Sequence, residues 1–243
     1  MKKYRNRIYS HYVEAWDESI VARSVNDFSG RAPTMRRVIR DFFPKEKSAA
    51  ILDLGCGHGT LVYFALQAGY SITQGIDVSA QQVKLAHKLG IPNVMQGDLM
   101  ETLKTIPHES LDAVVAFDVI EHFTKDELID LVDAVNGVLK PGGRLIIHAP
   151  NANSPFFGSI RYGDYTHEQA FTPSSLQQLL KASKFRKVEF AECAPMVHGL
   201  KSFLRVIVWK LVRFVFSIAH VAESGEIGQD IVLTRNFYAI AFK

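Results

Sequence analysis

The chain of 243 residues is 47% apolar, which suits one α/β domain with a substantial core. Its formal net charge of only +3, with no run of five basic residues, gives no reason to expect a nucleic-acid partner. Two cysteines are too few for a disulfide framework or a zinc site, and no apolar signal region follows the basic start, so a reducing, cytoplasmic setting is expected.

Residues 1–44 are expected to form a helical region ahead of the main domain. Aromatic and apolar residues recur at helical spacing over 4–25, and Pro33 opens a second helix over 34–43 that ends before Pro44. This region either caps a ligand crevice or only packs on the edge of a sheet, and both interpretations stay open.

The main domain, 45–243, opens with a short apolar strand at 51–54 and a glycine turn at 55–59. Gly55, Gly57 and Gly59 alternate in this turn, and the helix that follows points its free N–H groups into it. A dinucleotide site would have the spacing G-x-G-x-x-G instead. Asp53, two residues before the first glycine, would repel a pyrophosphate and attract a cation.

Two further acids end the next two predicted strands, which cover 71–77 and 93–98. Asp77 can accept hydrogen bonds from both hydroxyls of a ribose, and it lines up with Asp53 and Asp98 along one crevice at the carboxyl ends of the strands. Each acid also has a local explanation, because Asp77 could cap the next helix and Asp98 could be a turn residue.

The stretch from Asp53 to Gly59 resembles motif I of the class I S-adenosylmethionine (SAM)-dependent methyltransferases, D/E-x-G-x-G-x-G, at every defined position. The Lys-Pro-Gly-Gly turn at 140–143, before a fifth strand at 144–149, is another mark of this family. The resemblance implies a Rossmann-like seven-stranded sheet, mostly parallel with an antiparallel last strand, and helices on both faces. It also implies that SAM is bound by Asp53, Gly55, Cys56, Gly57, Gly59, Asp77, Val78, Asp98, Leu99 and Asp118.

The fourth strand, 111–117, leads into Asp118, Glu121 and His122. Their D-x-x-E-H spacing resembles the E-x-x-E-H of quinone-biosynthesis O-methyltransferases and small-RNA 2′-O-methyltransferases. That resemblance implies a divalent metal held by these three residues near the acceptor hydroxyl, although Asp118 is one methylene shorter than the Glu of the pattern. The alternative is that His122 packs beneath the cofactor without any metal.

The polar, aromatic loop over 150–170 resembles that of methyltransferases encoded with bacterial surface-polysaccharide biosynthesis. We expect His167 to be the general base, because its unperturbed pKa lies near neutrality, with Asp164 orienting it and His122 as a second catalytic candidate. The alternative is a structured loop in which His167 and Asp164 satisfy backbone groups. The residues expected to contact the acceptor are Asn151, Arg161, Tyr162 and Tyr165.

A helix over 173–183 precedes two last strands at 187–193 and 231–242, which are expected to pair antiparallel. The insertion between them, 196–229, is strongly apolar at 200–219 but is interrupted by Lys201, Arg205, Lys210 and Arg213. These charges argue against a membrane-spanning helix. A lid, a homodimer contact and a membrane-surface helix that places the chain peripheral to the inner membrane all stay open.

These features predict a SAM-dependent O-methyltransferase that acts on a hydroxyl of a sugar or glycan intermediate, in surface polysaccharide biosynthesis. One alternative is a quinone or small-phenol O-methyltransferase, favoured by the D-x-x-E-H spacing and the apolar insertion. The other is a non-catalytic SAM-binding subunit of a membrane-associated complex.

Overall fold

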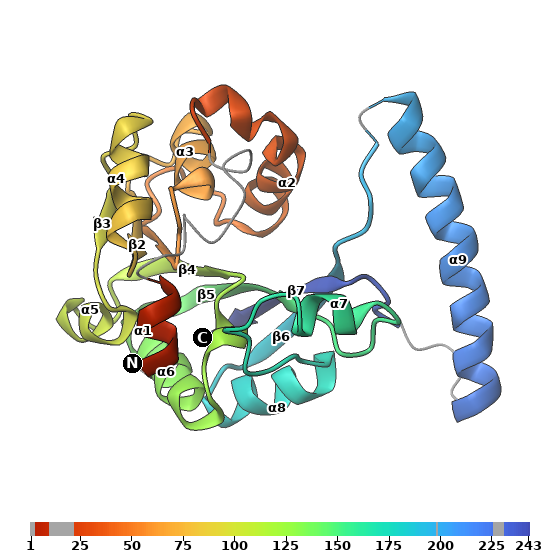
Figure 1. Ribbon diagram of the computed structural model, residues 1–243. Coiled ribbons are helices and arrows are strands. Elements are labelled where there is room, and N and C mark those ends of the chain that lie inside the picture. The colour runs from red at the N-terminus through yellow and green to blue at the C-terminus, as the bar shows by residue number, and fades with distance from the viewer. Residues whose placement is uncertain (1–2, 10–21, 198, 226–230) are drawn as a thin grey trace.

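Seven strands form one mixed sheet with the order β3-β2-β1-β4-β5-β7-β6 (Figure 1). The computed structural model describes residues 3–9, 22–197, 199–225 and 231–243. β7 runs antiparallel to both of its neighbours and every other pair is parallel, so the predicted Rossmann-like sheet is confirmed. The strands are β1 (Ile51–Leu54), β2 (Thr73–Asp77), β3 (Val94–Gln96), β4 (Leu111–Phe117), β5 (Leu139–Pro150), β6 (Lys187–Glu192) and β7 (Asn236–Phe242).

Helices cover both faces of the sheet, with α2, α3 and α4 on one face and α5, α6 and α8 on the other (Figure 1). The remaining helices of the described chain are the short α1 and α7, the 3-10 helices η2 and η3, and the long α9. The helices are α1 (Lys3–Tyr9), η2 (Val25–Gly30), α2 (Ala32–Phe42), α3 (Thr60–Gln67), α4 (Ala80–Lys88), α5 (Leu99–Thr105), η3 (Ile120–His122), α6 (Lys125–Val138), α7 (Phe157–Arg161), α8 (Pro173–Ala182) and α9 (Leu200–Ser224).

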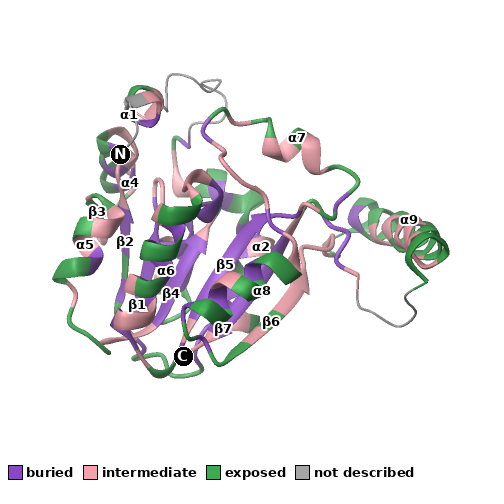
Figure 2. Ribbon diagram, turned by 90° about the horizontal axis from the view of Figure 1, so that it is seen from below, coloured by how far each residue is buried: buried purple, intermediate pink, exposed green. Residues whose placement is uncertain are grey.

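The central strands are apolar nearly throughout because both of their faces are buried (Figure 2). Successive strand residues point to opposite faces. In β4, Val114 and Ala116 therefore pack with α6 and α8, whereas Ala113 and Val115 pack with α2 and α3. The sheet thus holds its carboxyl strand ends rigidly at one edge, where the candidate site lies.

The structure differs from the predicted elements at a few boundaries. β5 begins at Leu139, five residues earlier than expected, because Leu139 already pairs with Leu111 and the glycine pair bonds to Lys243 of the chain end. The short helix α7 lies inside the expected loop. Of the helix expected over 4–25, the described residues contain α1 and the beginning of η2, and residues 10–21 lie outside the described part.

Candidate active site

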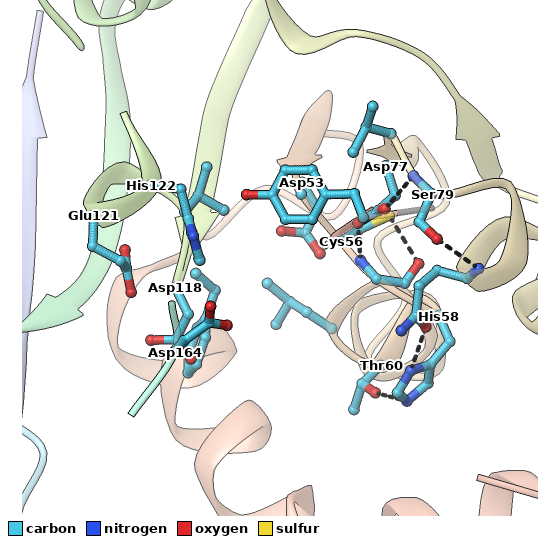
Figure 3. Close-up of a pocket in the computed structure, with 18 of the residues that line it drawn as sticks. Asp53, Cys56, His58, Thr60, Asp77, Ser79, Asp118, Glu121, His122 and Asp164 are labelled. Atoms are coloured by element: carbon cyan, nitrogen blue, oxygen red, sulfur yellow. Dashed lines mark hydrogen bonds between the residues drawn. The ribbon is translucent and has the colours of Figure 1, made fainter. Parts of the chain in front are cut away.

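One cavity of about 1780 Å³ lies at the carboxyl ends of β1, β2 and β4. Sites for small ligands usually measure roughly 300–1,000 Å³, so this cavity has room for a cofactor together with an acceptor. In Figure 3 the glycine turn and Asp77 lie on one side of it, and Glu121, His122 and Asp164 lie on the other. The two ends carry different chemistry.

The glycine turn needs its glycines for two separate reasons. At Gly55, φ is +64° and an added Cβ would lie 2.7 Å from Cγ2 of Val119, so neither the backbone nor the space suits another residue. At Gly59, φ is +81° and an added Cβ would lie 2.8 Å from Val94. Gly55 and Gly57 line the cavity, whereas Gly59 lets α3 pack closely against the sheet.

Asp77 is fixed by two backbone N–H groups. Its Oδ2 accepts a hydrogen bond from Gly57 (2.7 Å) and its Oδ1 accepts one from Ser79 (2.8 Å), as the dashed lines in Figure 3 show. Burial raises the pKa of this carboxyl group, and the two bonds counteract the rise. Asp77 lines the cavity with a fixed orientation, and its remaining lone pairs could accept hydrogen bonds from a ligand.

Asp53 is a buried acid of the cavity lining. Its Oδ1 has no hydrogen-bond partner among the described residues. Burial, together with the nearby Asp77 carboxylate, raises the pKa of Asp53 well above its usual range. An unsatisfied buried carboxylate is costly, so this position fits a positively charged or hydrogen-donating ligand group, such as SAM carries.

Asp98 lines the cavity and also has a local role, which is that of a helix cap and not the turn residue of the alternative interpretation. It is the N-cap of α5, where its Oδ1 accepts bonds from the N–H groups of Met100 (2.9 Å) and Glu101 (3.2 Å), and it also lines the cavity. Val78 and Leu99 line the cavity beside it. Cys56 lines it as well, and burial raises the pKa of its thiol, which keeps the group protonated.

Asp118 bonds to a histidine that the sequence did not single out. Its Oδ1 lies 2.6 Å from Nδ1 of His148, which is buried and stacks on Phe117 at 4.0 Å between ring centres. Burial opposes a charge on His148, but the Asp118 carboxylate outweighs it and raises the pKa of His148 to about 10. Asp118 remains 49% exposed because it faces the cavity, and its backbone φ is +57°.

A cluster of Glu121, His122 and His167 lies at the other end of the cavity, with one potential ligand atom from each within 4.8 Å of the others. Among the described residues this is the group that could hold a metal ion. Asp118 was expected in that group, and this expectation needs correction: its carboxylate bonds to His148, and His167 takes its place. Glu121 is 1% exposed, and its Oε2 has no hydrogen-bond partner in the described part of the chain. Burial raises the pKa of its carboxyl group.

In both histidines the hydrogen-bond network assigns the proton to Nδ1, which leaves Nε2 unprotonated. The Thr166 hydroxyl donates to Asp164 (2.6 Å), so it accepts from Nδ1 of His122 (2.8 Å). Nδ1 of His167 donates to the Ile160 carbonyl (2.9 Å). Burial and the neighbouring His167 lower the pKa of His122 to about 4, so His122 is neutral at pH 7.

Asp164 therefore orients His122 through Thr166. The sequence had suggested that Asp164 orients His167 instead.

The loop places the residues that were expected to contact the acceptor away from the cavity lining. Asn151 is fully buried and donates to the carbonyls of Val232 and Thr234 (both 2.8 Å). The side chain of Asn151 is thus buried and hydrogen-bonded within the fold. The expectation that it contacts the acceptor therefore needs correction.

Arg161 is also used by the loop, because its guanidinium donates to the carbonyls of His167 (2.6 Å) and Glu168 (2.7 Å). Tyr162 and Tyr165 are 76% and 83% exposed and are not among the cavity residues. Contact of these three residues with an acceptor would require the loop to rearrange. In the structure, Arg161 instead fixes the backbone that presents His167.

No motif in the sequence marks the N-terminal residues that line the cavity. Arg5 and Tyr9 of α1, and Phe28 of η2, contribute to the lining, and Arg31 adds a cation that makes no ion pair with any described residue. Burial would raise the pKa of Asp118, but His148 outweighs it and lowers this pKa, and Arg31 lies close enough to add a smaller electrostatic effect in the same direction. Isolated residues of these types carry no motif, so no signal in the sequence could have pointed to them.

The fold and the glycine turn with its two following acids define a Rossmann-like nucleotide-cofactor site, and comparison with known proteins gives the family. Residues 28–189, more than half of the chain, match a family model described as a methyltransferase domain. The chain therefore belongs to the class I SAM-dependent methyltransferases. A SAM-dependent methyltransferase from Archaeoglobus fulgidus shares the fold, with a TM-score of 0.64 and 23% identity over 88% of this chain and 94% of that one.

Two curated relatives are ubiquinone biosynthesis O-methyltransferases. The protein of Idiomarina loihiensis is 27% identical over 153 residues, and the mitochondrial protein of Rattus norvegicus is 33% identical over 150 residues. The matches cover 57% and 54% of this chain, and 62% and 42% of the two relatives. The chain thus matches only part of the length of these relatives.

Proposed function

We propose that the chain transfers a methyl group from SAM to a hydroxyl group of a small-molecule acceptor. The observation that carries this proposal is that one cavity joins the glycine turn to the cluster of Glu121, His122 and His167. When bound, SAM supplies a methyl group on a positively charged sulfur. The residues of the chain would then bring acceptor and methyl group together and manage the proton of the hydroxyl.

The glycine-turn end would hold the cofactor. Asp53 would face its positive charge, Asp77 would accept hydrogen bonds from the ribose hydroxyls, and Asp98 would lie beside the adenine. We add Arg31 to this set, because its guanidinium forms no ion pair with the described residues and so suits the carboxylate of SAM. Residues 1–44 would act as a cap, since α1 and η2 both contribute to the lining.

The opposite end would activate the acceptor. His167 has its Nε2 free to accept the proton of the acceptor hydroxyl, because Nδ1 already donates to Ile160. The charge that His167 then gains would lie 4.0 Å from Oε1 of Glu121. His122, held neutral by burial, would line the acceptor space beside it.

A divalent metal is the second way in which this end could activate a hydroxyl. Two imidazoles and one carboxylate suit a transition metal, so Glu121, His122 and His167 would hold it, and it would make the hydroxyl more acidic. Treatment with EDTA separates the two possibilities. Loss of activity that is restored by added metal would support the metal, whereas activity unchanged by EDTA would leave His167 as the base.

Two classes of acceptor follow from the sequence. The expected sugar or glycan rests on the loop over 150–170, and none of the compared proteins supports it. The curated relatives favour a quinone or another small phenol, because both are ubiquinone biosynthesis O-methyltransferases. We therefore place the phenol class first and keep the sugar class as the second candidate.

Calorimetric titration with SAM, followed by transfer from radiolabelled SAM to a panel of catechol-type phenols and sugar nucleotides, tests the proposal. Saturable SAM binding with label in a phenol would support it, and label only in a sugar would restore the original expectation. Binding without transfer to any acceptor would favour the non-catalytic subunit. Absence of SAM binding would contradict all three.

A further inference from the structure

α9 carries an apolar surface that no other described element covers. Figure 1 shows this helix standing apart from the sheet and its flanking helices, and Ser202 is its only buried residue. The spacing of three and four residues places nine large side chains along one side of the helix, and they are 41% to 76% exposed. This apolar stripe consists of Leu200, Phe203, Leu204, Ile207, Val208, Leu211, Phe214, Val215 and Ile218.

The other side of α9 is attached to the domain. Arg213 pairs with Glu192 of β6 (Nε to Oε2, 3.3 Å) and donates to the carbonyl of Ile231 (3.2 Å), and Trp209 is half-buried on the same side. These contacts thus hold α9 with its apolar stripe facing away from the domain. Figure 2, which views α9 nearly end-on, shows it lying clear of the buried sheet.

Cations border the apolar stripe on both sides. With 100° between successive residues, Lys201 and Arg205 fall along one border and Lys210 falls along the other, and all three are exposed. The only acid in α9 is Glu223, in its last turn. Since Arg213 is already paired with Glu192, three cations remain for a partner outside the described chain.

We propose that α9 docks on an anionic phospholipid surface, with its apolar stripe inserted among the acyl chains and its bordering cations at the headgroups. Such a helix lies in the plane of the membrane interface, and its 25 residues would extend for about 37 Å along it. No described helix is long and apolar enough to cross a membrane, so α9 lies on the surface and does not span it. This docking is independent of the proposed acceptor.

A second copy of the chain fits the same surface less well. Two apolar stripes packed face to face would gather the bordering Lys and Arg residues of both helices around one seam, with Glu223 as the only acid of each helix. Anionic headgroups neutralise every one of these cations, and each contributes about 1 kcal/mol near a charged membrane. The charge pattern therefore favours lipid over self-association.

Co-sedimentation of the full chain with vesicles tests the docking. We expect it to pellet with phosphatidylcholine vesicles that contain about 30% phosphatidylglycerol, and much less with phosphatidylcholine alone or at about 1 M salt, where charges are screened beyond about 3 Å. Reversing the three bordering cations (Lys201→Glu, Arg205→Glu, Lys210→Glu) should lower the partition coefficient on the order of a hundredfold. The matched control reverses the exposed Lys45, Lys84 and Lys88 and should bind as the parent does.

The apolar stripe is tested with Leu211→Glu and Phe214→Glu together, against Ile72→Glu, an exposed apolar residue on the main domain. The stripe variant should lose vesicle binding while its circular dichroism and SAM affinity stay those of the parent, and the control should keep binding. No pelleting of the parent with anionic vesicles would overturn the proposal. Vesicle binding by the stripe variant equal to that of the parent would also overturn it. So would light scattering that shows a dimer of the parent, if the stripe variant is monomeric and still binds lipid as the parent does.

Discussion

Oδ1 of Asp118 lies 2.6 Å from Nδ1 of His148, and this pair joins the end of β4, which lines the candidate active site, to β5. The histidine is buried against Phe117 and Tyr238, whereas the acid faces the cavity. The bond therefore fixes the Asp118 side chain at the place where the cofactor would meet the acceptor.

Removing His148 should destabilise the protein. His148→Gln deletes a charged partner but leaves Asp118 accessible to water in the cavity, so we expect a loss of about 1–2 kcal/mol in the free energy of unfolding. Urea unfolding measures it, with His108→Gln, an exposed histidine, as the control. A double-mutant cycle with Asp118→Asn should show coupling between the two positions, and additive losses would contradict a direct interaction.

The same pair predicts how stability depends on pH. The pKa of His148 is about 10 when folded, above the value of about 6.5 expected when unfolded, so the folded state binds more protons between these values. The stabilisation is complete below about pH 6.5 and is lost as the pH rises towards 10. The parent should thus lose more stability than His148→Gln between pH 7 and pH 10, and parallel pH profiles would show that the histidine is not charged.

Asp53 should affect cofactor binding and stability in opposite directions. Asp53→Asn removes a buried acid whose Oδ1 accepts no hydrogen bond from any described residue, so the protein without SAM should be as stable as the parent or more stable. SAM affinity should fall about 10- to 100-fold, because a charged contact is lost. Calorimetry and thermal unfolding measure the two effects, and the control is Asp112→Asn, whose carboxylate pairs with Lys140 instead. Unchanged SAM affinity would remove Asp53 from the site.

The glycine turn can be tested against a glycine of the same backbone conformation. Gly55→Ala and Gly142→Ala both place a methyl group at positive φ, +64° and +78°, which should cost each variant about 1–2 kcal/mol of stability. Only at Gly55 does the added carbon meet a neighbour, Val119 at 2.7 Å, in the cavity lining. SAM affinity should therefore fall at least about tenfold in the first variant alone. An equal fall of SAM affinity in both variants would mean that backbone strain in general, and not the added carbon in the glycine turn, weakens SAM binding.

The sequence predicted the sheet, and the acids that lie together at one edge of it, because both depend on where strands end. Parallel strands place the residues that follow them at one edge, so Asp77 and Asp98 could be located from spacing alone. The acceptor end depends on which loop side chains are left free by the backbone. Asn151 donates to the carbonyl of Val232, in the distant segment before β7, and Arg161 donates to the carbonyl of His167 in its own loop. No local pattern reveals either use.

Contacts between residues from distant segments of the chain were the other feature that the sequence could not predict. His148 meets Asp118 because β5 pairs with β4 in a particular register, and His167 reaches Glu121 because its loop folds back over η3. Both histidines were visible in the sequence, but their partners were assigned wrongly or not at all. Arg31 reaches the cavity in the same way, from a segment that precedes the sheet.

We propose that methyl transfer takes place beside His167, at the opposite end of the cavity from the glycine turn. Single-turnover transfer from radiolabelled SAM, measured for the parent, His167→Ala and the exposed control His108→Ala with an accepted phenol, tests it most directly. We expect His167→Ala to slow transfer about 100-fold or more while SAM affinity stays within about twofold of the parent, and His108→Ala to match the parent. Transfer by His167→Ala at the parent rate would contradict the account.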